Sequence, residues 1–261
     1  MAFCPVPHTP RERMWLMVGA SLGVAAGRLL LKRSRSSSAS ASSIPAVGRS
    51  RIFTVVLTGG PCGGKSSSLE AFSDALKVKG YDVYTVPEVP TILIKGGCQY
   101  PGANGGEKLM QFEIGLIRLQ MQIEDSFLRI AASTGRPSVI VMDRGLIDIA
   151  AYLPKEQWRE LLAANASTEA DLASRYNMVL HLTTAAEGAE KFYTTANNHA
   201  RTETAEEARA LDAKMVENWA RAHGNVKVID NFGTFDEKVA RASAAVVKNV
   251  VHSLRSHRGV L

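Results

Sequence analysis

The chain has 261 residues, of which 46% are hydrophobic and 21% are charged, so it is neither fibrous nor wholly disordered. It is long enough for one sizeable α/β domain or two small ones. Its formal net charge of +6 is concentrated at one end, because residues 1–51 carry eight Lys or Arg and a single acidic residue. The remaining 23 basic and 24 acidic residues nearly cancel, so the globular part is neutral and its charge gives no support for DNA or RNA as a partner.

The three cysteines predict no disulfide framework and no zinc site, because Cys4, Cys62 and Cys98 do not have CxxC spacing. A reducing, intracellular compartment is the expectation that follows.

Residues 1–50 are expected to be an addressing segment that ends in a flexible Ser-rich linker. The run 14–31 is apolar apart from one arginine and is barely long enough to span a bilayer, with three glycines spaced for close helix packing. As a membrane anchor it would leave the basic flank facing the cytosol, where an anionic membrane surface or a phosphoinositide could bind it. The scarcity of acids also fits an organellar transit peptide, and a secreted or unstructured tail is a third alternative.

After the linker, strand-like and helix-like patterns alternate, which predicts one α/β domain over residues 51–256 with a parallel sheet and crossover helices. Helices are expected at 65–78, from about Glu107, and from Thr204, where Thr204 and Glu207 have the spacing of a capping box. The Gly- and Pro-rich residues 96–106 predict a loop near the site. The five expected strands lie at 52–57, 81–86, 138–142, 178–182 and 226–229.

Apolar residues that recur at three- and four-residue steps predict which face of two helices is buried. In the helix from Glu107 these residues are Leu109, Phe112, Leu116, Leu119, Ile123, Phe127 and Ile130. In the helix from Thr204 they are Ala208, Leu211, Met215 and Trp219.

Residues 59–66 match the phosphate-binding pattern G-x-x-x-x-G-K-[ST], and they lie between an expected strand and an expected helix. Glycines let backbone N–H groups surround a phosphate, and the helix N-terminus adds a partial positive charge. Lys65 is expected to reach the β- and γ-phosphates, and Ser66 to bind Mg²⁺. A guanine-reading Asn-Lys-x-Asp motif does not occur, which favours ATP or loose base selection. The predicted nucleotide-binding residues are Gly59, Gly60, Pro61, Cys62, Gly63, Gly64, Lys65, Ser66 and Ser67.

Charged residues near the expected strand ends are further candidates for catalysis, besides Lys65. Asp143 ends a buried strand and could hold Mg²⁺ together with Ser66, and Arg144 after it could reach an acceptor beside the γ-phosphate. Glu88 follows the second strand and could act as general base. Arg201, just before the capped helix, could close over the phosphates as part of a lid. Each also has an ordinary explanation, such as a capping Asp, a locally paired Arg or a solvated Glu.

Several segments, taken in order, resemble the AAA-type ATPase domain shared by NadR and TRPL translocation defect protein fourteen. They are residues 58–66, 86–88, 143–145 with Asp148 and Tyr152, 192–193, 201–203 and 229–231. The resemblance covers nearly all of 51–251 and implies a P-loop kinase-like fold. In NadR the related domain is a ribosylnicotinamide kinase, whereas the translocation-defect proteins are similar to trafficking factors that bind GTP and phosphoinositides.

The sequence therefore predicts an α/β P-loop NTPase with a five-stranded parallel sheet, helices on both faces and a lid segment. We expect it to bind ATP or GTP with Mg²⁺ and to transfer a phosphoryl group to a small hydroxylated acceptor. The alternative is a nucleotide-binding switch or phosphoinositide-binding trafficking factor with little turnover. A remodelling ATPase is disfavoured, because the sequence indicates no second domain that could supply an arginine finger.

Overall fold

The computed structural model describes residues 51–102, 104–193 and 204–256. One sheet of five parallel strands forms the centre of the domain, in the order β2-β3-β1-β4-β5. In β1, Leu57 is in register with Asp143 of β3 and Leu180 of β4, so the carboxyl ends of these strands meet at one edge. The strands are β1 (Ile52–Thr58), β2 (Asp82–Val86), β3 (Ser138–Asp143), β4 (Met178–Leu182) and β5 (Val226–Ile229).

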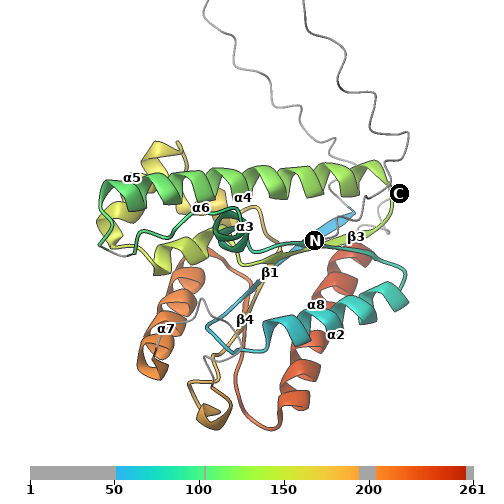
Figure 1. Ribbon diagram of the computed structural model, residues 1–261. Coiled ribbons are helices and arrows are strands. Elements are labelled where there is room, and N and C mark those ends of the chain that lie inside the picture. The colour runs from blue at the N-terminus through green and yellow to red at the C-terminus, as the bar shows by residue number, and fades with distance from the viewer. Residues whose placement is uncertain (1–50, 103, 194–203, 257–261) are drawn as a thin grey trace, which may run out of the picture. The chain divides into compact units, whose positions relative to one another are not determined.

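Helices cover both faces of the sheet, which confirms the predicted architecture. Helices α2 and α8 lie side by side against one face, while the long α4 runs across the other (Figure 1). The helices are α2 (Lys65–Val78), α3 (Val89–Lys95), α4 (Glu107–Ser133), α5 (Lys155–Ala164), α6 (Glu169–Ala173), α7 (Ala205–Ala222) and α8 (Phe235–Ser256), with the 3-10 helices η2 (Leu146–Ala151) and η3 (Glu190–Phe192).

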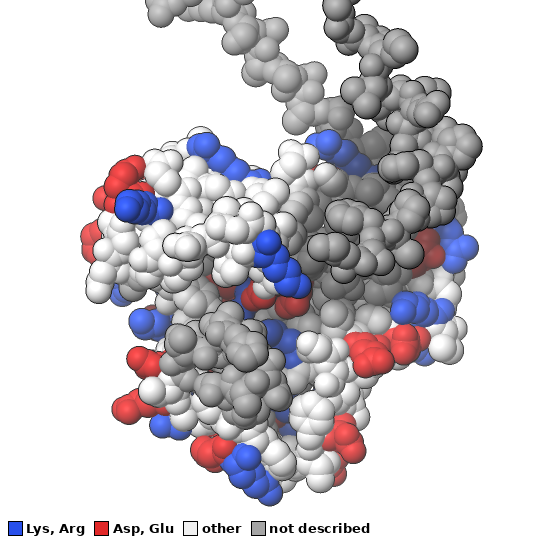
Figure 2. Space-filling model, viewed as in Figure 1, with Lys and Arg blue, Asp and Glu red and all other residues white. Residues whose placement is uncertain are grey.

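On the face of the domain drawn in Figure 2, acidic and basic side chains are interspersed. This mixture is what a globular part with nearly cancelling charges would show.

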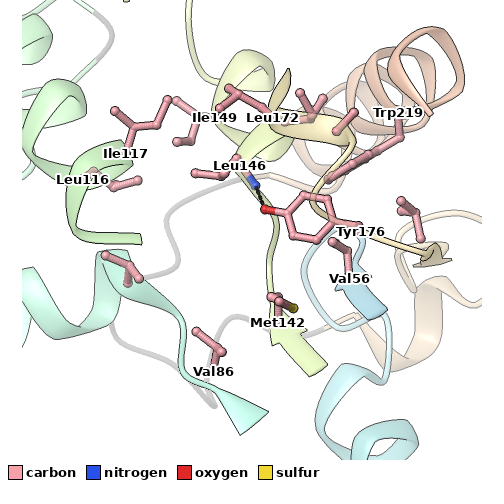
Figure 3. Close-up of a cluster of buried hydrophobic side chains, with 14 of the residues drawn as sticks. Val56, Val86, Leu116, Ile117, Met142, Leu146, Ile149, Leu172, Tyr176 and Trp219 are labelled. Carbon is pink, nitrogen blue, oxygen red and sulfur yellow. Dashed lines mark hydrogen bonds between the residues drawn. The ribbon is translucent and has the colours of Figure 1, made fainter. Parts of the chain in front are cut away.

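The alternation of β1 produces a core on each side of the sheet. Ile52 and Val56 pack in the cluster beneath α4, whereas Phe53, Val55 and Leu57 pack beneath α2 and α8. Figure 3 shows the first cluster, in which side chains from α4, η2 and α7 converge and the Tyr176 hydroxyl accepts a hydrogen bond from the Leu146 N–H at 3.1 Å. Both faces of β1 are therefore buried, as its β-branched apolar run predicts.

The buried face of α4 differs from the predicted one. Ile130 is 56% exposed, and several residues of the expected stripe are only half-buried. The buried side of α4 carries polar residues among the apolar ones. A search for apolar residues at helical spacing does not detect buried polar residues. The residues on the buried side are Leu109, Glu113, Leu116, Ile117, Gln120, Glu124, Leu128 and Ala131.

The buried face of helix α7 also differs from the predicted one, at a single position. The predicted capping box of α7 is present, because Thr204 Oγ1 accepts from the Glu207 N–H and the Glu207 carboxylate accepts from the Thr204 N–H. In the buried stripe, however, Asp212 takes the place expected for Leu211, which is only half-buried.

Helix α3 is absent from the sequence predictions, which placed no helix between the second strand and the loop at 96–106. Glu88 stands at its N-cap and Pro90 lies in its first turn, where a missing N–H costs nothing.

Among residues 51–256, leaving out 103 and 194–203, no helix combines the length and apolar character needed to cross a bilayer. The segment 1–50, on which the anchor, transit-peptide and linker predictions depend, lies outside the described residues.

Candidate functional site

The phosphate-binding loop joins β1 to α2 at the carboxyl edge of the sheet. Its start requires glycine: Gly59 has φ +131°, and a Cβ there would overlap the carbonyl oxygen of Leu182. Gly64 caps α2 without any side-chain hydrogen bond, and the first turn of α2 has no acidic residue. The N-terminal amides of α2 therefore remain available to an anion, as the motif predicts.

Lys65 is held by the loop it belongs to. Its Nζ donates to the carbonyl oxygens of Gly59 at 2.9 Å and Gly60 at 3.0 Å. Burial, and then the positive charge of Arg144, lower the pKa of Lys65 to about 8, against the opposing charge of Asp143. The ammonium is thus mostly protonated at neutral pH and concentrates positive charge beside the loop.

Asp143 and Ser66 are the two residues predicted to bind Mg²⁺. Asp143 ends β3 beside Leu57, and burial and the Glu88 charge raise its pKa against the influence of Lys65. Ser66 lies exposed at the start of α2. No group of three or more His, Cys, Asp or Glu that could hold a metal occurs in the described part of the chain. A carboxylate and a hydroxyl are the oxygen donors that Mg²⁺ prefers, so these two residues would fit an ion that takes its other ligands from phosphates and water.

Arg144 and Glu88 form an ion pair across β3 and β2, with Arg144 Nε 2.5 Å from Glu88 Oε1. Arg144 has φ +72°, and its backbone is fixed by its N–H donating to Leu57 O and its carbonyl accepting from Gln120 Nε2. Burial disfavours the charge on Glu88, but Arg144 and the Thr91 hydroxyl outweigh it and lower its pKa. Glu88 is therefore a carboxylate at neutral pH.

Asp148 belongs to the segments that resemble the AAA-type ATPase domain. It lies behind the candidate site rather than in it. Its Oδ1 accepts from the Thr58 hydroxyl at 2.6 Å and from Trp219 Nε1 at 2.7 Å, and its Oδ2 accepts from the Gly145 N–H at 2.9 Å. This buried carboxylate joins the end of β1 to η2 and α7.

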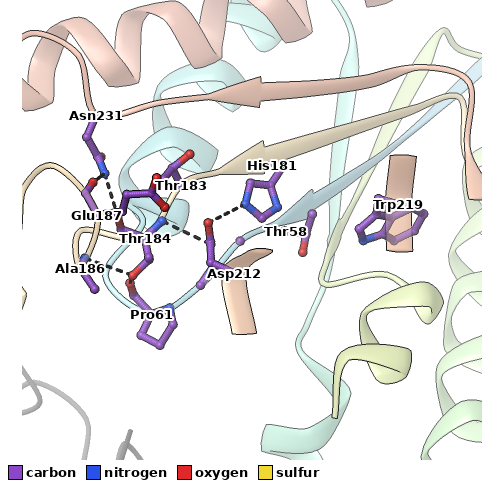
Figure 4. Close-up of polar contacts among 12 residues, drawn as sticks. Thr58, Pro61, His181, Thr183, Thr184, Ala186, Glu187, Asp212, Trp219 and Asn231 are labelled. Carbon is purple, nitrogen blue, oxygen red and sulfur yellow. Dashed lines mark hydrogen bonds and ion pairs between the residues drawn. The ribbon is translucent and has the colours of Figure 1, made fainter. Parts of the chain in front are cut away.

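Asp212 is a site residue that the sequence predictions missed. Its Oδ1 accepts from the Gly60 N–H at 2.6 Å and from the Thr184 N–H at 3.3 Å, and its Oδ2 lies 3.1 Å from His181 Nε2 (Figure 4). The Thr184 hydroxyl donates to Pro61 O at 2.6 Å. Helix α7 and the end of β4 are thereby fastened to the phosphate-binding loop. The only sequence signal was a lone acid next to an apolar stripe.

The predicted lid arginine, Arg201, lies outside the described residues. The other arginine of that helix start, Arg209, donates from Nη1 to Ala186 O at 2.8 Å and so holds the loop after β4. Cys62 has φ +56°, and neither it nor Cys98 forms a disulfide.

Comparisons with known proteins agree with this geometry. A family model described as an AAA domain matches residues 54–238. NadR in complex with NAD and AMP-PNP is 14% identical with a TM-score of 0.52, and NadR in complex with NR is 17% identical with a TM-score of 0.54. Each alignment covers 77% of this chain and 51% or 53% of the NadR chain, so this chain spans about half the length of those proteins.

Shikimate kinase from Acinetobacter baumannii, in complex with shikimate, is 13% identical with a TM-score of 0.44, over 77% of this chain and 94% of that chain. No curated protein sequence matches the chain. At these identities the likeness to NadR shows the fold alone. With the family match over most of the described residues, the chain belongs to the AAA domain family and has a P-loop kinase-like fold.

Proposed function

We propose that this domain binds a nucleoside triphosphate with Mg²⁺ and transfers its γ-phosphoryl group to a hydroxyl of a small acceptor. The observation that carries the proposal is the Arg144–Glu88 ion pair, which lies at the ends of β3 and β2 next to Lys65 and Asp143. A nucleotide switch needs the phosphate loop and Mg²⁺. It has no use for a partly buried guanidinium and carboxylate on the side of the sheet away from β4.

The proposed reaction follows from the charges present. Lys65 and the loop amides would neutralise the phosphates, and Ser66 and Asp143 would hold Mg²⁺, which stabilises the charge of the transferred group. The acceptor oxygen would bond to the γ-phosphorus as the bond to the bridging oxygen breaks, and the acceptor proton would pass to Glu88. If the phosphates draw Arg144 toward them, Glu88 loses its counter-charge and becomes more basic.

The base of the nucleotide would lie beside α8. A Cβ on Gly64 would come within 2.8 Å of Phe235 Cε2, so the Phe235 ring lies against the loop. Phe235 is 50% exposed and Phe232 is 82% exposed. Aromatic rings stack on any base, which supports binding of either ATP or GTP.

The direct test measures nucleoside diphosphate release by the full chain with Mg²⁺, with and without hydroxylated acceptors. Lys65→Ala should lower turnover by about 100-fold or more, because the phosphate charge loses its main cation. Lys77→Ala is the matched control, since Lys77 lies at the far end of the same helix, where it is exposed and pairs with Asp74. Its turnover should equal that of the unaltered protein.

Glu88→Gln separates transfer from binding. It should leave nucleotide affinity nearly unchanged while lowering acceptor-dependent turnover by roughly 10²-fold or more. Tight nucleotide binding, with slow turnover that no acceptor raises and that Glu88→Gln does not alter, would instead identify a switch.

A further inference from the structure

Three polar residues interrupt the buried face of α4, and two of them have clear structural roles. Glu124 accepts from Arg175 Nε at 2.8 Å, from the Tyr176 hydroxyl at 2.9 Å and from Gln120 Nε2 at 3.1 Å. Gln120 also donates to the Arg144 carbonyl. The third residue, Glu113, is only 3% exposed and forms no hydrogen bond or ion pair with any described residue.

Glu113 lies at the carboxyl edge of the sheet. Helix α4 ends at Ser133, shortly before β3 begins, so it runs antiparallel to the strands and its N-terminal turns lie above the edge where Arg144 stands. Glu113 is seven residues before Gln120 on the same face. Two helical turns therefore place it about 10 Å beyond the contact of Gln120 with Arg144.

Two tyrosines from other elements connect Glu113 to Arg144 through electrostatic interactions. Tyr100, from the loop between α3 and α4, packs edge-on against Phe112 with ring centroids 5.5 Å apart. Burial, then the charge of Glu113, then Tyr152 raise the pKa of Tyr100 to about 12. Tyr152, which follows η2, also interacts electrostatically with Arg144. Glu113, Tyr100, Tyr152 and Arg144 thus form one continuous group, here called the α4 acceptor group.

The α4 acceptor group favours some ligands over others by charge. A buried carboxyl without a partner is unfavourable, and burial raises the pKa of Glu113 to about 7. A hydroxyl or a cationic group would satisfy it. A carboxylate or phosphate on the acceptor, placed against the Glu113 carboxylate, would be repelled.

We propose that Glu113 is a specificity-determining residue of the acceptor site, where it binds a hydroxyl or cationic group and excludes acids. The acceptor is therefore a hydroxylated compound that is neutral or positively charged. This inference rests on the proposed phosphoryl transfer, since it names the class of acceptor.

The test uses the full chain with ATP and Mg²⁺ and three acceptors that differ in charge: uridine, the cation ribosylnicotinamide and the acid shikimate. The unaltered protein should phosphorylate uridine, ribosylnicotinamide or both, and not shikimate. Glu113→Gln should raise KM for that acceptor by tenfold or more with little change in kcat and in ATP affinity. Its melting temperature should be equal or higher, because the substitution removes a buried charge and keeps the shape.

Glu107→Gln is the matched control, because Glu107 is an exposed glutamate of the same helix whose carboxylate accepts a hydrogen bond from Gln111. Its acceptor KM should not change. An unchanged KM in Glu113→Gln, or a preference of the unaltered protein for shikimate, overturns the assignment of Glu113.

Calorimetry with a non-hydrolysable ATP analogue separates the two proposals. If neither these three compounds nor any other hydroxylated acceptor raises nucleoside diphosphate release, the proposed function fails. Binding of uridine or ribosylnicotinamide that Glu113→Gln weakens would still support the subsite. Binding of neither, or equal binding by both proteins, overturns it.

Discussion

Glu113 and Glu124 lie on the same buried face of α4, but their surroundings differ. Burial raises the pKa of Glu124, against the effects of Arg175 and Tyr176, and its oxygens are satisfied by hydrogen bonds. Burial also raises the pKa of Glu113, but no described residue offers it a donor. Removing Glu124 would leave buried donors unpaired, whereas removing the charge of Glu113 would not.

The stability of the protein should therefore depend on pH through Glu113. Its pKa rises from 4.5 to about 7 on folding, so the folded state binds the extra proton between these values and stability falls as pH rises through them. Glu113→Gln should match the unaltered protein below about pH 4 and exceed it by about 3 kcal/mol above pH 7. Urea denaturation of both proteins across this range measures the difference.

Glu107→Gln serves again as the reference, because its exposed carboxylate has no burial cost. A constant difference between Glu113→Gln and the unaltered protein at every pH would show that Glu113 does not titrate with a raised pKa.

At the scale of elements, α7 and the phosphate-binding loop form one unit through Asp212. The carboxylate holds the Gly60 amide and lies beside His181 of β4, and the Thr184 hydroxyl adds a contact to Pro61. The loop that binds phosphates is thus supported by the helix that follows the segment containing Arg201.

Asp212→Ala should weaken nucleotide binding by about tenfold, because the loop loses the contact that fixes Gly60 and must be ordered by the ligand. Asp212→Asn keeps an oxygen for the Gly60 N–H and should have a smaller effect. Isothermal titration with ATP and Mg²⁺ measures both. Glu217→Ala, at an exposed position of the same helix, is the control, and an unchanged affinity in Asp212→Ala would contradict this role.

The sequence predicts well the elements that bury only apolar side chains. It predicts less well the elements that also bury polar side chains. The strands and the phosphate-binding loop appear where expected, because β-branched runs and a glycine pattern are local signals. Asp212 and Glu113 were missed, because their burial depends on groups from distant segments. Helix α3 was missed because two prolines flank Glu88 in the sequence.

At the scale of the whole molecule, the parallel sheet brings β1, β3 and β2 together in an order that sequence alone does not give. The phosphate loop follows the central strand, and Arg144 and Glu88 follow the next two strands outward. In the proposed function, this order would separate a nucleotide side from an acceptor side of one continuous edge. Whether 1–50 directs the protein to a membrane or an organelle remains a prediction from composition.

Because only the folded domain has the carboxyl edge of the sheet, nucleotide binding should stabilise the folded state. At a free ATP or GTP concentration of about 100 times Kd, with Mg²⁺, the free energy of unfolding should rise by about 2.7 kcal/mol. Thermal denaturation of the full chain measures this increase, which should disappear in Lys65→Ala. If neither nucleotide raises the melting temperature, the prediction of nucleotide binding is wrong.

The contact between Gly60 and Asp212 also provides a way to follow motion. A Cβ on Gly60 would lie 2.8 Å from Asp212 Oδ1 and 2.9 Å from Thr184 Cβ, so the Gly60 amide is enclosed as well as bonded. Its hydrogen can exchange with solvent deuterium only when α7 and the loop separate. The exchange rate at this one amide would therefore report how often the nucleotide side opens.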